Sequence, residues 1–395
     1  MRIPLYKTIT FIVTKDCQLA CKYCYLVAKN NKERMSFDVA KKAIDYILSN
    51  REHFAEKNVN IEFIGGEPCL EIDLIDQITD YFKRETYRLD HPWFSTYRLG
   101  FTTNGLNYNS KNVQNYILKN KEHLDVTITI DGTQSKHDLN RIYKNSGRGS
   151  YADVVKNIPL YTEQMERPAT KVTISSDDLP YVKESVLHLF SLGIQDIHIN
   201  CVFENVWKEG DDTILEEQLI GLADTMIEER LFENRTCSFF SETIGKPLNP
   251  YRNGNWCGTG KMMSIDAAGN FYPCTRFAQY SLREKKTRII GNIHDGINLN
   301  YLRPFLTLSV KAQNPRECIE CPIASGCAWC NGENYDAADT STIYQRSVAL
   351  CKMHKARVRT NNYFWNKLYR TLELEGLNQQ EAKKIIRVSS NKETC

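Results

Sequence analysis

From residue 8 to about residue 233 the chain alternates short runs rich in β-branched residues with longer segments whose apolar residues recur every three or four positions. This alternation is typical of βα units, in which each strand is followed by a helix that packs on a parallel sheet. Six such units fit in this stretch. The pattern therefore predicts an α/β fold, a partial (β/α)6 TIM-like barrel. The predicted strands are residues 8–13, 60–64, 98–102, 126–130, 171–175 and 196–202, and the predicted helices are residues 35–48, 70–83, 110–118, 151–165, 181–192 and 213–231.

Beyond residue 231 the chain becomes rich in Gly, Pro, Asn and Cys, with one hairpin predicted from residues 262–266 and 270–274 around Ala267-Ala268-Gly269. A helical pattern resumes from about residue 352 to residue 374, and a charged tail that we expect to be mobile follows it. We therefore predict a barrel over residues 1–235, a loop-rich extension over residues 236–352, and C-terminal helices with the tail over residues 353–395.

The chain has fourteen cysteines, and residues 1–14 show neither a basic segment nor a cleavage site of the kind that directs export. We therefore expect a cytoplasmic protein, where thiols stay reduced and cysteines bind metal more often than they form disulfides. A net charge of +3, with Lys and Arg interleaved with Asp and Glu, predicts no nucleic-acid partner. The absence of any long apolar stretch predicts no membrane partner.

The strongest local motif is Cys17-Gln-Leu-Ala-Cys21-Lys-Tyr-Cys24, which directly follows the first predicted strand. Three thiolates can hold three irons of a cubane cluster and leave the fourth iron without a protein ligand. A structural zinc site is normally closed by four ligands, and the first histidine, His53, lies beyond the next predicted helix. Three unrelated buried cysteines are the other alternative, which their close spacing in a polar loop disfavours.

This CxxxCxxC motif, with Tyr23 before its last cysteine, resembles the signature of the radical S-adenosylmethionine (SAM) superfamily. The resemblance implies that Cys17, Cys21 and Cys24 bind a [4Fe-4S] cluster, and that SAM chelates the open iron through its amino and carboxylate groups. It also implies that Tyr23 lies against the adenine. One electron then cleaves SAM into methionine and a 5′-deoxyadenosyl radical, which abstracts a hydrogen atom from the substrate.

The second predicted strand ends in Gly65-Gly66-Glu67-Pro68. Paired glycines let the backbone approach a ligand closely, and Glu67 can accept a hydrogen bond from an amine. Alone, this run is more often a turn than a site. After a CxxxCxxC motif it resembles the family motif that contacts the methionyl amino group of SAM.

The ends of the third and fourth predicted strands carry Asn104-Gly105 and Thr129, followed by Arg141. They resemble radical SAM peptide modifiers, including anaerobic sulfatase-maturing enzymes, in which such strand ends line the SAM pocket. The likeness implies that Asn104 lines the pocket, that Thr129 contacts the ribose and that Arg141 pairs with the methionyl carboxylate. The alternatives are a plain turn at Asn104 and a surface ion pair at Arg141.

A second group of seven cysteines lies in the loop-rich region, where bound metal would supply folding energy that the apolar residues do not. Two zinc-ribbon staples are the alternative. The pattern resembles the SPASM extension of radical SAM peptide maturases, although two residues separate Cys327 from Cys330 where that family usually has three. The resemblance implies three [4Fe-4S] clusters in all, with one auxiliary cluster on Cys257, Cys274 and Cys330 and the other on Cys318, Cys321, Cys327 and Cys351.

These likenesses imply a peptide maturase that modifies a side chain of a ribosomally made precursor peptide; no catalytic residue is assigned. A sulfatase-maturing type of protein oxidase is disfavoured. In those enzymes an Asp acts as the catalytic base at the position where this chain has Thr275, and a threonine cannot accept a proton at neutral pH. A non-catalytic iron-sulfur electron carrier, or a zinc-stapled binding protein, leaves the strand-end motifs without a purpose. Sixteen residues precede Cys17, so we expect a separate leader-peptide-binding protein or direct docking of the precursor. A flavodoxin- or ferredoxin-type reductant is the expected electron donor.

The set Cys257, Cys274 and Cys330 supplies three thiolates for four irons. Cys237, the nearest thiol upstream, can loop back and close the cluster, since long loops close at modest entropic cost. An open iron would instead suit a substrate cysteine and favour formation of a thioether. We expect the open site, with a buried Cys237 that binds no metal.

Overall fold

The computed structural model describes residues 6–29, 31–249, 251, 253–255 and 257–386. The strands are β1 (Tyr6–Thr14), β2 (Asn58–Gly65), β3 (Tyr97–Thr103), β4 (Leu124–Ile128), β5 (Ala169–Ile174), β6 (Asp196–Cys201), β7 (Thr236–Cys237), β8 (Met263–Ile265), β9 (Asn270–Tyr272), β10 (Gly291–Asn292) and β11 (Gly296–Ile297). The helices are α1 (Phe37–Ser49), α2 (Ile72–Arg88), α3 (Lys111–Asn120), α4 (Gln134–Asn140), α5 (Tyr151–Val154), α6 (Ile158–Gln164), α7 (Val182–Ser191), α8 (Asp211–Glu228), α9 (Leu299–Leu306), α10 (Val310–Gln313), α11 (Arg316–Ile319), α12 (Asn331–Asp336), α13 (Cys351–Leu374) and α14 (Gln379–Ile385).

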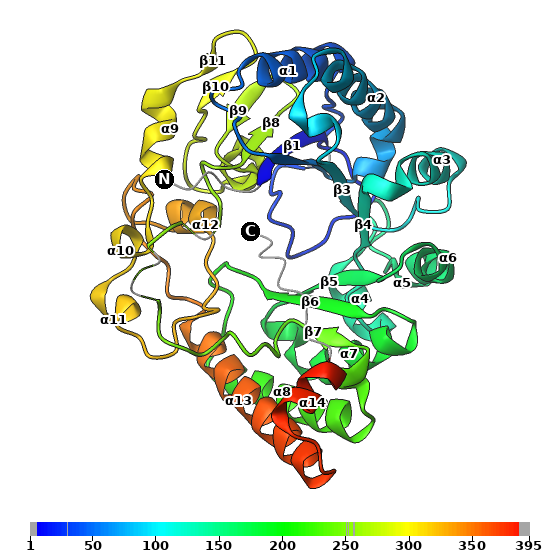
Figure 1. Cartoon of the computed structure of the whole chain (residues 1–395), viewed down its shortest axis with the longest axis vertical. Helices are drawn as coiled ribbons and strands as arrows, with labels where there is room; N and C mark the ends of the chain where they lie inside the picture. The colour runs from blue at the N-terminus through cyan, green and yellow to red at the C-terminus, as the bar shows by residue number, and fades with distance from the viewer. Residues whose placement is uncertain (1–5, 30, 250, 252, 256, 387–395) are drawn as a thin grey trace.

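Two sheets face each other across the centre of the molecule, and helices cover their outer sides (Figure 1). The first sheet has the order β11-β10-β9-β8-β1-β2-β3-β4, and the second has the order β5-β6-β7. Strands β1 to β4 run parallel to one another, and so do β5 to β7. The predicted α/β fold with a parallel sheet is therefore confirmed.

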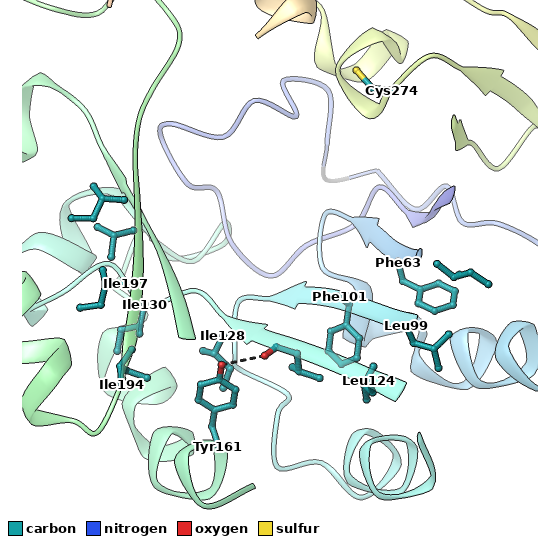
Figure 2. Packing of buried hydrophobic residues seen from close by; sticks show 14 of the residues in the cluster. Phe63, Leu99, Phe101, Leu124, Ile128, Ile130, Tyr161, Ile194, Ile197 and Cys274 are labelled. Carbon is teal, nitrogen blue, oxygen red and sulfur yellow. Dashed lines mark hydrogen bonds between the residues drawn. The ribbon is translucent and has the colours of Figure 1, made fainter. Parts of the chain in front are cut away.

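Strands β2 to β6 bury every second side chain against the outer helices and turn the alternate side chains inward. The buried set is mostly aliphatic and aromatic, and burial of one such side chain contributes about 1.5–3 kcal/mol. In Figure 2 the Tyr161 side chain reaches from α6 toward Ile128 of β4, and its hydroxyl donates toward the Val126 carbonyl at 3.1 Å. The main apolar core thus lies between the strands and the helices, outside the barrel.

The two sheets are not joined by a backbone ladder where β4 meets β5; side chains join them instead. The buried Thr170 hydroxyl donates to the carbonyl of Ile128 at 2.8 Å and accepts from the amide of Ile130 at 3.1 Å. One carboxylate oxygen of Asp131 accepts from the Thr173 amide at 3.1 Å. These bonds satisfy backbone groups that an open edge would otherwise leave buried and unpaired.

The hairpin predicted in the loop-rich region forms as β8 and β9, and it belongs to the first sheet. β8 runs parallel to β1, with Ile9 beside Met263 and Phe11 beside Ile265. The turn needs Gly269, whose φ is +80°, because an added Cβ would lie 2.6 Å from Ile293. β7 likewise extends the second sheet past residue 235. The predicted division of the chain at residue 235 therefore stays a prediction, with paired strands on both sides of it.

The helix predicted from residue 352 is α13, which packs along α8 at the lower edge of Figure 1. Arg359 pairs with Glu216, and Lys367 pairs with Asp224 at 2.7 Å. The tail predicted to be mobile, residues 387–395, lies outside the described residues.

One predicted helix is broken in the structure, and one further helix forms that was not predicted. The segment 151–165 is broken into α5 and α6 by a tighter turn over Val155–Asn157, next to Pro159 near the start of α6. Helix α4 has no predicted counterpart, because its seven residues are too polar and too few to show a helical period. No helix in the described part of the chain is long and apolar enough to cross a lipid bilayer.

Replacing Thr170 with Val tests the side-chain link between β4 and β5. The near-isosteric change leaves the Ile128 carbonyl and the Ile130 amide buried without their partner, so we expect a loss of about 1–3 kcal/mol in the free energy of unfolding. Urea unfolding under anaerobic conditions measures the loss. Thr102→Val, at an exposed position of β3, is the matched control. Equal midpoints for the two variants would show that this link carries no stability.

Candidate functional site

The loop that follows β1 lies inside the ring of strands and carries Cys17, Cys21 and Cys24 (Figure 1). Burial raises the pKa of the Cys17 thiol to about 11, while the nearby Lys29 ammonium acts in the opposite direction. Lys29 interacts with all three thiols, which outweigh its own burial and raise its pKa. The three sulfur atoms of the CxxxCxxC motif are therefore gathered around one cation.

The cysteine loop is held to the segment that follows α4. The amide of Ala20 donates to the Ile142 carbonyl at 2.8 Å, and the amide of Lys22 donates to the Asn140 carbonyl at 3.1 Å. Within the loop, the Cys24 amide bonds to the Cys21 carbonyl at 3.1 Å. These backbone bonds hold the loop that carries the thiols to the segment after α4.

Gly65 and Gly66 lie at the end of β2, directly against this loop. A Cβ added at Gly65 would lie 2.1 Å from the Thr14 carbonyl oxygen. One added at Gly66 would lie 2.2 Å from the Asp16 carbonyl oxygen and 2.9 Å from the Cys17 Cβ. The sequence predicted that these glycines let the backbone approach a ligand; the structure shows that they admit the cysteine loop.

Glu67 is buried at 1% exposure and joins the ends of two strands. Its Oε1 accepts from the Thr103 hydroxyl at 2.7 Å and from the Cys69 amide at 3.0 Å, and its Oε2 accepts from the Asn104 amide at 2.7 Å. Burial raises the pKa of this carboxyl group, and these donors, together with the Cys69 thiol, oppose that shift.

Tyr23 links two buried charges across the barrel. Its hydroxyl donates to Asp131 and accepts from the Arg141 guanidinium at 2.9 Å. Burial raises the pKa of Asp131, but Lys136, Arg141 and other neighbours outweigh it, so the pKa is lowered and the group stays ionised. Tyr23 was predicted to lie against an adenine ring, and the structure adds that its hydroxyl is bonded within the protein.

The other residues predicted to bind SAM surround this link. Asn104 donates its side-chain amide to Gln18 of the cysteine loop at 3.0 Å. Thr129 is buried, and its amide donates to the Thr103 carbonyl at 2.9 Å. The Arg141 Nε atom is buried and has no hydrogen-bond partner within the described residues. An unpaired guanidinium N–H at this place would suit an anionic ligand group.

Cys257, Cys274 and Cys330 come together beneath the hairpin. Cys330 interacts electrostatically with both of the others, and burial raises the pKa of the Cys274 thiol to about 12. The Thr259 hydroxyl lies 2.9 Å from the Cys257 sulfur and 3.9 Å from the Cys274 sulfur. The Asn331 side-chain amide donates to the Cys257 sulfur at 2.8 Å. These contacts link Cys257 to Cys274 and Cys330, and their role as ligands of one cluster stays a prediction.

Arg276 connects this group to the first cysteine loop. Its Nε donates to the Cys330 sulfur at 3.5 Å, and its guanidinium lies 4.8 Å from the centre of the Tyr25 ring, next to Cys24. Glu204 and Glu333 approach the same guanidinium at 3.1 and 3.6 Å. Burial lowers the pKa of Arg276, but the thiolate and the carboxylates outweigh it and raise the pKa.

The last four predicted ligands, Cys318, Cys321, Cys327 and Cys351, form a third group. Arg346 donates to the Cys327 sulfur at 2.9 Å. Cys318 interacts electrostatically with Cys321 and Cys351, and Cys327 interacts with Cys318 and Cys351. Cys351 is exposed at the start of α13. The assignment of these ten cysteines to three clusters stays a prediction.

The sequence analysis gave no role to Asp131, or to the cations Lys29, Arg276 and Arg346. Asp131 follows β4 directly, where a carboxylate at a strand end signals a site. Each cation lies a few positions along the chain from a predicted ligand cysteine, and this closeness in sequence could have indicated its place beside the thiols. Among the described residues, no group of three or more His, Cys, Asp or Glu side chains is arranged to hold a single metal ion.

Comparisons with known proteins match these features. Residues 7–155, which hold the first cysteine loop, match the family described as a 4Fe-4S single cluster domain. An uncharacterized protein of Methanocaldococcus jannaschii, MJ0907, is 33% identical over 47% of this chain and 59% of its own length. The matched part of the chain thus spans under two thirds of that relative.

The radical SAM cyclopropyl synthase TigE of Paramaledivibacter caminithermalis is 21% identical over 82% of this chain and 67% of its own length. The chain is thus similar to radical SAM enzymes over most of its length. The solved structure of anSMEcpe with bound AdoMet and the Kp18Cys peptide has the same fold, with a TM-score of 0.65 at 16% identity, over 93% of this chain and 99% of that one.

The residues of this site fit an iron-sulfur cluster and SAM. Cys17, Cys21 and Cys24 offer three thiolates and no fourth, which suits a cubane with one open iron. The unpaired Nε of Arg141 offers a donor to a carboxylate, and Glu67 offers an acceptor to an amine.

The surroundings of Cys237 predict that it holds no cluster. It pairs with Ile197 between β7 and β6, burial raises its pKa to about 11, and its charged neighbour is Arg357. Cys237→Ala should therefore leave the iron content and the cluster spectra unchanged, whereas Cys330→Ala should lose the signal of one cluster. Iron analysis and electron paramagnetic resonance of the dithionite-reduced proteins measure this. Loss of one cluster from Cys237→Ala would identify it as a ligand.

Proposed function

We propose that this radical SAM enzyme modifies a side chain of a ribosomally made precursor peptide. The observation that carries the proposal is the meeting of Cys17, Cys21 and Cys24 with the Tyr23–Asp131–Arg141 link inside the barrel. The likeness to TigE over most of the chain supports it, as does the fold shared with anSMEcpe, which was solved with a peptide.

The chain's own residues have separate tasks in this proposal. Cys17, Cys21 and Cys24 would bind three irons of a [4Fe-4S] cluster, and Lys29 would offset the negative charge of their thiolates. Such a cluster, once reduced by an external donor, would supply the electron for cleavage of SAM into methionine and a 5′-deoxyadenosyl radical. Arg141 binds the SAM carboxylate through the N–H that has no partner in the protein. Glu67 accepts a hydrogen bond from the SAM amino group.

The remaining predicted contacts shape the same pocket. Tyr23 keeps the Arg141 guanidinium and the Asp131 carboxylate apart by one hydroxyl, so both charges stay fixed. Thr129 contacts the ribose. Asn104 holds the cysteine loop to the end of β3 through Gln18. Gly65 and Gly66 act indirectly, because they let the loop lie close to β2.

The two further cysteine groups would each hold an auxiliary [4Fe-4S] cluster, which makes three clusters in the chain. The group of Cys257, Cys274 and Cys330 leaves one iron open if Cys237 stays in the core. An open iron would bind a cysteine thiolate of the substrate, so a thioether cross-link is the modification that we favour. The division into residues 1–235, 236–352 and 353–395 is part of this proposal.

A sulfatase-maturing activity has less support. The residue after Cys274 is Thr275, whose hydroxyl lies 3.0 Å from that of Ser264 and is no base at neutral pH. For partners, we propose the precursor peptide, a separate protein that binds its leader, and a flavodoxin- or ferredoxin-type reductant.

Replacing Cys17, Cys21 and Cys24 together with Ala tests the reaction. We expect 5′-deoxyadenosine formation to stop and the iron content to fall by about one cubane, since each such cluster uses three of these ligands. The auxiliary clusters should remain, because the other cysteines are grouped around separate centres. Chromatography of reactions with dithionite and SAM measures the product, and undiminished 5′-deoxyadenosine from the triple variant would end the assignment.

Arg141→Gln tests how SAM is held. Losing a charge-assisted bond in a buried site should weaken SAM binding about tenfold or more, while the iron content stays the same. Calorimetry of the reconstituted protein without reductant measures the affinity. Arg148→Gln is the control, because Arg148 is exposed and pairs with Asp153 on the surface. Equal affinities for the two variants would remove Arg141 from the site.

A further inference from the structure

The inner face of the barrel is polar. The alternation that sends apolar side chains toward the helices sends polar side chains to the opposite side of each strand. Several of these inward side chains are exposed to water. The inward, exposed positions of β2 to β6 are Glu62, Arg98, Thr102, Asp125, Lys171, His198 and Asn200.

Lys171 occupies the centre of β5 on this inner face, beside His198 of β6 in the register of the second sheet. Water reaches its side chain, yet surrounding protein atoms desolvate the ammonium enough to lower its pKa. Glu62, on β2 of the opposite sheet, is in the same situation, and burial raises its pKa.

Lys171 shares its face of β5 with Thr173, whose amide donates to Asp131 at 3.1 Å, so its position on the strand is close to the Tyr23–Arg141 link. It interacts with Asp131, which belongs to the Tyr23–Arg141 link, and with Arg276 and Cys330 of the second cysteine group. Glu62 and His198 also interact with it. A substrate that meets both the radical and the second cysteine group would therefore pass this ammonium.

The other charges near this position already have partners. Arg276 pairs with Glu204 and Glu333, and Asp131 accepts from Tyr23 and the Thr173 amide. Within the part of the chain that the structure describes, neither Lys171 nor Glu62 forms a hydrogen bond or a close ion pair. Lys171 is therefore the charged residue that interacts with both centres and has no close partner among the described residues, and its charge is positive.

We propose that Lys171 binds a carboxylate of the substrate peptide, from an Asp or Glu side chain or from the C-terminus, and so selects the segment that is presented to the radical. This proposal rests on the proposed function, because it assumes a peptide substrate. Glu62 faces the same ammonium and competes with the substrate carboxylate. Lys171 is in this respect a specificity-determining residue.

Short fluorescein-labelled peptides of Gly, Ser and Cys test the site. One carries a Glu, a second has Gln in its place, a third has Lys, and all three are amidated at the C-terminus. A fourth peptide has only a free C-terminal carboxylate. Fluorescence anisotropy with the SAM-loaded protein, without reductant, measures binding. We expect the Glu peptide to bind about tenfold tighter than the Gln peptide, as a charge-assisted bond to a desolvated ammonium predicts.

Variants assign the preference to one side chain. Lys171→Gln should abolish the preference, Lys171→Arg should keep most of it, and Glu62→Gln should increase it by removing the competing carboxylate. Unfolding midpoints and iron contents show whether the variants fold. If Lys171→Gln does not fold, Lys171→Arg and Glu62→Gln still test the proposal. The fourth peptide shows whether a C-terminal carboxylate is sufficient.

Equal binding of the Glu and Gln peptides, no measurable binding of the Glu peptide, or a preference that survives in Lys171→Gln would each overturn the proposal. Failure of the proposed function is separable from these outcomes. A protein that releases no 5′-deoxyadenosine with dithionite, but still prefers the Glu peptide, would refute the radical chemistry and retain the carboxylate site.

Discussion

The centre of this protein depends on two buried carboxylates at strand ends, Glu67 and Asp131. A buried charge without partners costs several kcal/mol, so each must be surrounded by donors or cations. Glu67 meets this requirement with the backbone at the ends of β2 and β3. Asp131 meets it with Tyr23, the Thr173 amide and nearby cations. Since Tyr23 lies on the cysteine loop, satisfying Asp131 also positions the thiols.

The split between β4 and β5 has a related consequence. Side-chain bonds from Thr170 and Asp131 satisfy the facing backbone groups, so the sheets do not need a continuous ladder to stay together. The inner face of the barrel can be polar, because the apolar core lies on the outside between strands and helices. A polar inner face suits a polar substrate.

Each cysteine group in the protein is accompanied by a cation: Lys29, Arg276 or Arg346. Burial alone raises the pKa of a thiol and disfavours the thiolate that metals require. A nearby positive charge lowers the pKa of the thiol and so offsets part of the rise that burial causes. The same requirement explains why Arg276 is held by Glu204 and Glu333, which fix its guanidinium beside Cys330.

The sequence alone determined the α/β class, the positions of β1 to β6, helix α13 and the order of the cysteine motifs, because hydrophobic period and Cys spacing are local signals. It also determined which family this chain resembles. Tertiary structure decided that β8 extends the first sheet beside β1, that Gly65 and Gly66 face the loop, and that Lys171 lies near both Asp131 and Cys330. Such facts depend on contacts between residues distant in the chain, and no local pattern records which distant segments meet.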